Sequence, residues 1–241
     1  MTDGIKNYFE LVGKPWGRMF YDLIYLQLNI PETPKLRILD FGSGFGICSN
    51  HYAQHHEVTA IEPNADMISL RFCDNQYKQL HGGIEILSQF NAEFDLVLCH
   101  NVLEYARNQE DISTELAKTL NPGGRLSVVK HNTYGRVMAS AVFEENPEKA
   151  INLLDDVKTD QRSSFGDRFL YSEKDILFWA DKNELTLTSQ YGIRTFFALT
   201  QNNDIKFDAG WYGKMLELEY KACNIDEFKK IAFFNHFIFQ K

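Results

Sequence analysis

Residues 36–46 read LRILDFGSGFG, a short apolar run that ends in a glycine cluster. The run has the length of a β-strand and is continuously apolar, which is typical of a strand buried on both faces of a parallel sheet. The glycines let a ligand approach the backbone closely and supply positive φ angles where a tight turn needs them. Because a helical pattern follows at residues 46–55, the stretch predicts a nucleotide-type binding loop in an α/β domain.

Apolar runs and helical patterns alternate from residue 36 to about residue 130. The further strand candidates are HEVTAIE (56–62), IEIL (84–87), EFDLVLCH (93–100) and GRLSVVK (124–130). Helical patterns occupy residues 46–55, 64–79 and 108–120, and Asn64 is a candidate N-cap for the second of them. This alternation predicts βαβ units and a parallel sheet.

The segments on either side of this region complete the domain. An apolar stripe predicts a helix from Trp16 to about Leu28, and the polar stretch 133–171 predicts a helical insertion. Ser172 and Asp175 have the spacing of a capping box that opens another helix. Residues 185–197 and 231–239 read as two closing strands, of which the second is apolar enough to lie inside the sheet rather than at its edge.

Composition excludes several classes of protein. The 241 residues are 44% hydrophobic and 24% charged, which is typical of a soluble globular chain. A formal net charge of −8 argues against a non-specific polyanion binder. Without a long apolar run or a secretory signal we expect no membrane segment and a cytoplasmic location. Four cysteines without CxxC spacing and the adjacent His55 and His56 predict reduced thiols and no metal site.

Two carboxylates accompany the glycine loop. Glu62 ends the next strand candidate 20 residues after Gly42, where it can accept both hydroxyls of a ribose. Asp40 directly precedes the loop, whose spacing is GxGxG rather than the GxGxxG of pyrophosphate binders. An acidic residue beside the loop favours a cofactor that carries positive charge and no phosphate, such as S-adenosylmethionine. A nicotinamide or flavin site and a turn without a ligand are the alternatives.

Four motifs of the chain carry a family resemblance. The chain resembles the class I, Rossmann-like S-adenosylmethionine-dependent methyltransferases in ILDFGSGFG, VTAIEP, FDLVLCHNVLEYA and LNPGGRLSVV. The resemblance implies a seven-stranded, mostly parallel sheet with an antiparallel last strand, together with an N-terminal helix and helical caps. We expect a single domain over 1–241, with its core at about 36–132 and 172–241, an N-terminal segment 1–35, and caps at about 133–171 and 198–230.

The resemblance also implies a set of cofactor-binding residues. Gly42, Ser43 and Gly44 should line the methionine part, Asp40 should lie near its ammonium, and Glu62 should hold the ribose. Glu85 should reach the adenine amino group, unless it is a solvated loop carboxylate. Met67 should pack on the adenine or in the core, and His100 should approach the cofactor through its backbone or ring.

A narrower resemblance concerns the acceptor. KPWGRMF, CHNVLEY, HNTYGRV, YGIRTFF and MLELEY are similar to the bacterial methyltransferases that esterify 5-carboxymethoxyuridine at the wobble position of tRNA. It implies that Arg18 reaches the methionine carboxylate and that Arg194 fixes a substrate carboxylate, with an exposed charge and a structural salt bridge as the respective alternatives. Asn132 also matches, whereas His131 and Phe197 stand where the family usually has tyrosine and histidine. All three are expected at the substrate site.

These patterns predict an S-adenosylmethionine-dependent methyltransferase that acts on a small molecule or on a tRNA anticodon loop. An ionised carboxylate acceptor needs no general base, and His131 is the candidate base for an acceptor that carries a proton. A non-catalytic cofactor- or partner-binding module on the same fold is the alternative. Either a monomer or a homodimer is compatible with the sequence.

Overall fold

The computed structural model describes residues 3–155, 169 and 171–241. Its centre is one seven-stranded sheet in the order β3-β2-β1-β4-β5-β7-β6. The strands are β1 (Arg37–Phe41), β2 (Glu57–Glu62), β3 (Lys78–His81), β4 (Phe94–His100), β5 (Leu120–His131), β6 (Thr186–Ile193) and β7 (Phe234–Gln240). β7 lies between β5 and β6 and is antiparallel to both, whereas β1 to β5 pair in parallel. The predicted Rossmann-like sheet with an antiparallel last strand inside it is therefore confirmed.

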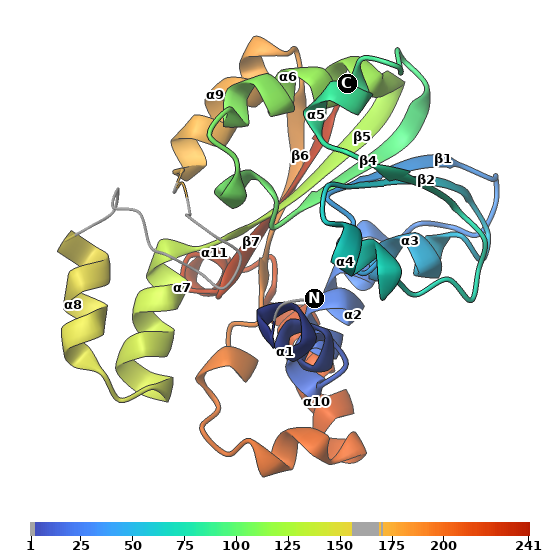
Figure 1. The fold of residues 1–241 in the computed structure, drawn as a ribbon. Coiled ribbons are helices and arrows are strands. Elements are labelled where there is room, and N and C mark those ends of the chain that lie inside the picture. Colours follow the sequence, from blue (N-terminus) through green and yellow to red (C-terminus); the bar gives the residue numbers. More distant parts are fainter. Residues whose placement is uncertain (1–2, 156–168, 170) are drawn as a thin grey trace.

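Helices cover both faces of the sheet (Figure 1). One face carries α5 (Ile84–Leu87), α6 (Gln109–Thr119) and α9 (Glu173–Lys182), and the other carries α2 (Pro15–Leu28), α3 (Ile47–Tyr52) and α10 (Ala209–Ala222). Successive residues of β1 point to opposite faces, so that Leu39 belongs to the first core cluster and Ile38 to the second. This explains why the strand is continuously apolar, as a strand buried on both faces must be.

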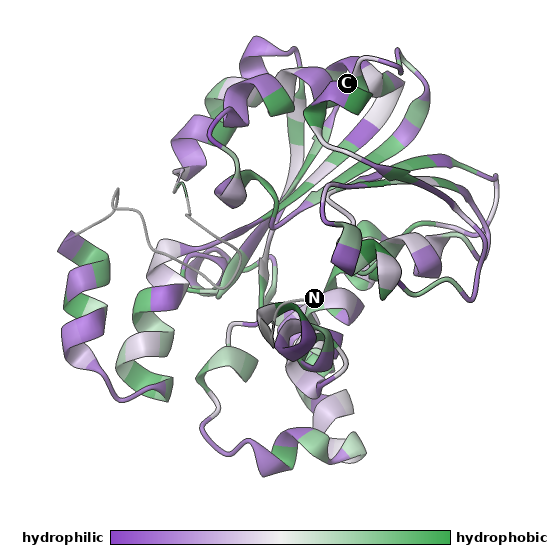
Figure 2. Ribbon diagram, in the orientation of Figure 1, coloured by the Kyte–Doolittle hydropathy of each residue, from purple (hydrophilic) through white to green (hydrophobic). Residues whose placement is uncertain are grey.

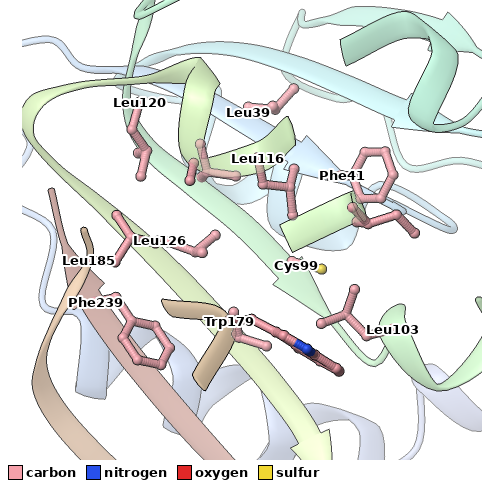
Figure 3. Packing of buried hydrophobic residues seen from close by; sticks show 14 of the residues in the cluster. Leu39, Phe41, Cys99, Leu103, Leu116, Leu120, Leu126, Trp179, Leu185 and Phe239 are labelled. Carbon is pink, nitrogen blue, oxygen red and sulfur yellow. The ribbon is translucent and has the colours of Figure 1, made fainter. Parts of the chain in front are cut away.

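The core beneath α6 and α9 joins side chains from strands far apart in the sequence. Leu39 of β1, Leu126 of β5 and Phe239 of β7 meet Trp179 of α9 there (Figure 3). Hydrophobic residues concentrate on the strands and on the helix faces turned toward them (Figure 2). The predicted capping box that opens α9 is present, with Ser172 Oγ accepting from the Asp175 amide and Asp175 accepting from the Ser172 amide.

The strand prediction for IEIL (84–87) is wrong. Those residues form the helical turn α5, and the third strand is β3, whose sequence KQLH gave no strand signal. β3 is the edge of the sheet and is only partly buried, so it does not need an apolar run. Gly82, at φ +154°, ends the strand, and the apolar side chains of Ile86 and Leu87 then pack into the core from a helix.

Two helix predictions also differ from the structure. The pattern at 64–79 yields only α4 (Ala65–Ser69), although Asn64 caps it as predicted by accepting from the Asp66 and Met67 amides. Residues 3–12 form an additional helix, α1 (Asp3–Val12), which was not predicted. The predicted helix from Trp16 to Leu28 is confirmed as α2, which begins at Pro15.

The remaining helices belong to the two segments expected to be caps. The first comprises α7 (Thr133–Met138), the π-helical η2 (Ala139–Phe143) and α8 (Pro147–Asp155); much of the rest of 133–171 lies outside the described residues. The second comprises η4 (Asp204–Phe207), α10 and α11 (Asp226–Lys229), after the 3-10 turn η3 (Phe197–Leu199). Figure 1 shows α1, α7, α8 and α10 gathered at the end of the molecule where β5 passes into α7. Within the described part of the chain no helix is long and apolar enough to span a bilayer.

Candidate active site

A cavity lies where β1 and β4 end. It measures about 450 Å³ when the open solvent at its mouth is included. Its lining comes from α1, α2, the glycine loop, α3 and the end of β4: Tyr8, Phe20, Tyr21, Asp40, Gly42, Ser43, Gly44, Phe45, Cys48, His100 and Asn101. The carboxyl ends of parallel strands at a switch in strand order are the usual ligand site of such sheets.

The glycine loop is held against the end of β2. The amides of Gly42 and Ser43 both donate to the Ile61 carbonyl, at 2.8 and 3.0 Å. Gly42 has φ +73°, and a Cβ on it would meet Val102 Cγ2 at 2.3 Å, so both conformation and space require glycine there. The loop therefore places backbone rather than side chains at the cavity wall.

Asp40 is buried beneath this loop. Its carboxylate accepts a hydrogen bond from Ser49 Oγ at 2.6 Å, and only 4% of the residue is exposed. Burial raises the pKa of Asp40 to about 6, an effect that the Ser49 hydroxyl opposes and the nearby Glu62 carboxylate reinforces. A cationic group in the cavity would stabilise the ionised form.

Glu62 is fixed by two backbone amides. Its oxygens accept from Gly44 N at 2.8 Å and from Asn64 N at 2.9 Å. Burial raises the pKa of Glu62 despite these bonds. Each carboxylate oxygen can accept a second hydrogen bond, so the group keeps acceptor capacity for hydroxyls of a ligand.

His100 belongs to a buried chain of hydrogen bonds. Gln27 Nε2 donates to the Gly192 carbonyl, so Gln27 Oε1 accepts from His236 Nδ1 at 2.8 Å. Ser127 Oγ lies 2.8 Å from both His236 Nε2 and His100 Nε2, and therefore donates to His236 and accepts from His100. This order leaves His100 Nδ1 as an acceptor facing Cys48 Sγ at 3.9 Å. Burial lowers the pKa of His100 to about 3, so the ring is neutral at physiological pH.

The cavity fits a ligand that combines a cation, polar groups and a flat apolar part. Asp40 supplies the anionic wall, and the rings of Phe20 and Tyr21 supply flat apolar surface that also suits a cation. Among the described residues, Ser43 Oγ and Asn101 Oδ1 are buried here without a hydrogen-bond partner. Buried polar atoms without a partner are costly, which indicates that a ligand or solvent completes them.

Four of the predicted cofactor residues lie outside the cavity lining, and one of them, Glu62, still contacts it by accepting from the Gly44 amide. Arg18 is exposed, with its guanidinium carbon 4.9 Å from the centre of the Tyr212 ring. Glu85 is exposed, and its carboxylate accepts from the Gly83 amide of its own turn at 2.7 Å. Met67 is buried in a cluster with Phe45 and with residues of α1, next to the loop.

The predicted acceptor residues gather around the start of β7. Arg194, directly after β6, has φ +61°, a conformation that costs a side-chain-bearing residue about 1 kcal/mol or more. Its guanidinium carbon lies 5.3 to 5.7 Å from the ring centres of Phe197, Phe233 and Phe234. The His131 ring is also beside Phe233 and Phe234, at 5.9 and 4.7 Å.

Asn132 and Phe197 have structural partners in the same region. Asn132 Nδ2 donates to the carbonyls of Lys230 and Ala232, both at 2.8 Å, and its Oδ1 caps α7. Phe197 is fully buried and packs against Trp211 and Tyr212. Asn132 therefore positions the turn after β5, and Phe197 forms part of the wall around Arg194.

The arginine region and the cavity share an aromatic wall. Phe234, beside Arg194, contacts Phe20 with ring centres 4.9 Å apart, and Phe20 lines the cavity. A ligand that contacts both regions would therefore span one layer of rings. This juxtaposition joins segments that are separated by more than 170 residues in the chain and is invisible in the sequence.

Three buried ionisable residues near the site were missed by the sequence analysis. Glu104 is 1% exposed and accepts from the His131 amide at 2.8 Å, and its carboxylate lies 3.5 Å from His131 Nδ1. Glu219 accepts from the amides of Thr195, Phe196 and Phe197 at 2.7 to 2.8 Å. Lys206 is 4% exposed. The first two lie in motifs quoted for the resemblance, CHNVLEY and MLELEY, whereas Lys206 had no sequence signal.

Residues 39–128 match the family described as a methyltransferase domain. The chain carries a methyltransferase domain. Solved structures described as S-adenosylmethionine-dependent methyltransferases share its fold, and S-adenosylmethionine is the cofactor of this domain.

Similar proteins agree with this assignment. The chain is 23% identical to the tRNA 5-carboxymethoxyuridine methyltransferase of Escherichia coli over 211 residues. The aligned region covers 84% of this chain and 78% of the relative. The chain is 28% identical over 138 residues to a ubiquinone biosynthesis O-methyltransferase of Coxiella burnetii, over 52% of this chain and 58% of the relative. The crystal structure of a SAM-dependent methyltransferase from Archaeoglobus fulgidus superposes with a TM-score of 0.62 at 15% identity, over 97% of this chain and 99% of that one.

Proposed function

We propose that this methyltransferase esterifies the carboxylate of a 5-carboxymethoxyuridine-like nucleotide at the wobble position of tRNA. The observation that carries the proposal is Arg194. Its guanidinium is enclosed by three phenylalanine rings, and no carboxylate of the described residues lies within 4.0 Å of it. A guanidinium in such a place is suited to bind a carboxylate through two parallel hydrogen bonds.

Residues in and beside the cavity take the following parts in this proposal. Asp40 pairs with the ammonium of the cofactor, Glu62 accepts hydrogen bonds from the ribose hydroxyls, and the backbone of Gly42, Ser43 and Gly44 lines the methionine part. Tyr8 of α1 is part of the cavity wall. Arg18, Met67 and Glu85 stay candidates for cofactor contacts, although none of the three lines the cavity.

The proposed reaction requires no proton transfer by the protein. When bound, the cofactor supplies an electrophilic methyl group on a sulfonium, and the protein holds the acceptor in line with it. A carboxylate is already ionised at neutral pH, so no side chain must remove a proton. Arg194 orients the carboxylate, while His131 and Phe197 line the space in which the acceptor lies.

Basic residues near this region are suited to contact tRNA phosphates. Lys14 lies over Trp16, whose ring contacts Phe207 of η4, and Arg18 lies over Tyr212 of α10. Both therefore belong to the side of the molecule that also carries Arg194. Phosphate contacts of this kind position a nucleic acid without reading its sequence.

A second candidate function is methylation of a hydroxyl on a small molecule. The observation that favours it is the buried Glu104, whose carboxylate lies 3.5 Å from His131 Nδ1. A carboxylate in this position can orient an imidazole and stabilise its protonated form, which is the arrangement of a general base. His131 would then take the proton of the acceptor.

The nucleoside content of cellular tRNA distinguishes the tRNA acceptor from the small-molecule acceptor. We expect cells that lack the protein to accumulate 5-carboxymethoxyuridine-type nucleosides without their methyl ester, as measured by mass spectrometry of digested tRNA. Arg194→Met should fail to restore the ester, while the matched control Arg37→Met, an exposed arginine paired with Glu93, should restore it. An unchanged nucleoside profile would remove the tRNA proposal.

A further inference from the structure

We propose that Arg194 and Lys206 together form a binding site for a single carboxylate group, in which Lys206 is a second substrate-binding residue. The inference deepens the proposed function and rests on it in one respect, namely that the carboxylate belongs to the methyl acceptor. The two cations come from different parts of the fold. Arg194 follows β6, and Lys206 lies in η4 of the second cap.

Lys206 lies in an unusual environment for a lysine. Only 4% of the residue is exposed, and its ammonium donates a hydrogen bond to Asn203 Oδ1 at 3.0 Å. Among the described residues no carboxylate lies within 4.0 Å of its Nζ. Because an ammonium has three donors and burial removes water from it, a buried lysine without an anionic partner is costly.

The two cations face the same ring. Lys206 Nζ lies 4.9 Å from the centre of the Phe197 ring, and the Arg194 guanidinium carbon lies 5.7 Å from it. Phe143 of the first cap closes over Lys206, with its ring centre 4.9 Å from Nζ. Aromatic faces stabilise each cation. They do not neutralise either charge, and Arg194 still acts electrostatically on Lys206.

Glu219 neutralises only part of this charge. Its carboxylate attracts Arg194 electrostatically, but its oxygens accept from the amides of Thr195, Phe196 and Phe197 and lie beyond ion-pair distance of the guanidinium. Two cations and one carboxylate leave an excess of one positive charge. Arg194 Nε is also buried without a partner among the described residues. One monoanion, with two oxygens for two donors, would balance the excess.

The electrostatics and the location agree with a bound anion. Burial together with the neighbouring Arg194 lowers the pKa of Lys206 to about 8, and a carboxylate between the two would raise it again. Phe234, beside Arg194, contacts Phe20 of the cofactor-cavity lining with ring centres 4.9 Å apart. A carboxylate at Arg194 would therefore lie next to the wall of that cavity.

Binding of a small carboxylate tests the inference without tRNA. The probe is phenoxyacetate, which carries the same oxymethylene carboxylate as the proposed nucleoside, and the matched neutral probe is 2-phenoxyacetamide. Titration calorimetry in the presence of S-adenosylhomocysteine should show phenoxyacetate binding at least about tenfold tighter, as expected for charge-assisted hydrogen bonds. Lys206→Met should abolish most of this preference, and Lys206→Arg should keep it. Lys214→Met, an exposed lysine of α10, is the control and should behave as the wild type.

A second readout separates binding from a structural role. Because Met removes an uncompensated buried charge, Lys206→Met should raise the thermal midpoint of the protein without phenoxyacetate and lose the stabilisation that phenoxyacetate gives the wild type. Unchanged affinity for S-adenosylhomocysteine verifies that the variant is folded. Equal binding of the two probes by the wild type, or an undiminished preference in Lys206→Met, would overturn the inference. If phenoxyacetate binding depends on Lys206 but tRNA is not methylated, the site stands and the proposed acceptor is wrong.

Discussion

Cofactor affinity should fall on acidification because Asp40 must be ionised to pair with the ammonium of the ligand. Its folded-state pKa is about 6, so the carboxylate is largely ionised at pH 7 and largely protonated at pH 5. If only the ionised form binds, the apparent Kd is multiplied by one plus the ratio of protonated to ionised Asp40. This predicts an increase of about tenfold from pH 7 to pH 5, or about 1.4 kcal/mol.

The other ionisable groups around the loop either add to the loss of cofactor affinity at low pH or do not titrate in this range. Glu62 also has a raised pKa, so its protonation at low pH would add to the loss of affinity. His100 and His236 are buried with lowered pKa values and stay neutral through this range. The ammonium and carboxylate of S-adenosylhomocysteine stay ionised as well. If both carboxylates contribute, the apparent Kd should rise by more than the predicted tenfold between pH 7 and pH 5.

Isothermal titration of S-adenosylhomocysteine at several pH values measures this directly. Asp40→Asn is the matched variant, because an amide oxygen can still accept from Ser49 Oγ. We expect this variant to bind weakly at pH 7 and to lose most of the pH dependence. Equal affinity of the wild type at pH 5 and pH 7, or an unaltered pH profile in Asp40→Asn, would refute the reasoning.

The same carboxylate makes an opposite prediction for the stability of the unliganded protein. Because its pKa is raised on folding, the favourable contribution is complete below the unfolded value of 3.8 and is lost as the pH rises through about 6. At pH 7 the buried charge costs about 3 kcal/mol by this linkage. Asp40→Asn should therefore unfold at a higher denaturant concentration than the wild type at pH 7. A lower midpoint would contradict the raised pKa.

Three further substitutions test the site and its frame. Glu62→Ala should weaken S-adenosylhomocysteine binding by about 2 kcal/mol, because charged hydrogen bonds are lost, and titration calorimetry showing an unaltered Kd would exclude Glu62 from the ribose site. Gly135→Ala should lower the unfolding free energy by about 3 kcal/mol in a denaturant titration, because the new Cβ would meet the Ala232 carbonyl oxygen at 2.0 Å. Gly213→Ala is its control, because a Cβ at this exposed position of α10 would meet no atom within 4 Å; it should stabilise the protein by about 0.5 kcal/mol or more. Equal effects at the two glycines would show that crowding is not the cause. Glu219→Gln should raise the KM for the acceptor more than that for the cofactor, because the loop that carries Arg194 loses charge-assisted bonds to three amides. Glu217→Gln, on the exposed face of α10, is its control, and an equal rise in both KM values would contradict a role limited to the acceptor side.

The sequence by itself determined the sheet and the loop. Strands buried on both faces must be continuously apolar, so β1, β2, β4, β5 and β7 could be recognised one by one. The loop after β1 could be recognised because only glycine tolerates its backbone conformation and the close contact with Val102. Both signals are local, since they depend on the conformation and burial of consecutive residues.

Tertiary structure decided the edge strand and the first helix. β3 is polar because an edge strand is partly solvated, and its neighbour IEIL is apolar because it packs into the core from a helix. α1 has an amphipathic sequence, with Ile5, Phe9 and Val12 on one side, and only the tertiary structure shows that this side packs on Phe45 and Met67 beside the glycine loop. In each case the environment that fixes the residue lies elsewhere in the chain.

The surroundings of the charged residues on the acceptor side could not be predicted from the sequence either. The sequence pointed to Arg194 through a motif. It could not show that Lys206 is buried near the same Phe197 ring, or that Glu219 already accepts from three amides. Whether a charge is solvated, paired or in need of a ligand depends on what surrounds it in three dimensions. A sequence names the ionisable groups, and only the folded chain determines which of them lack a partner.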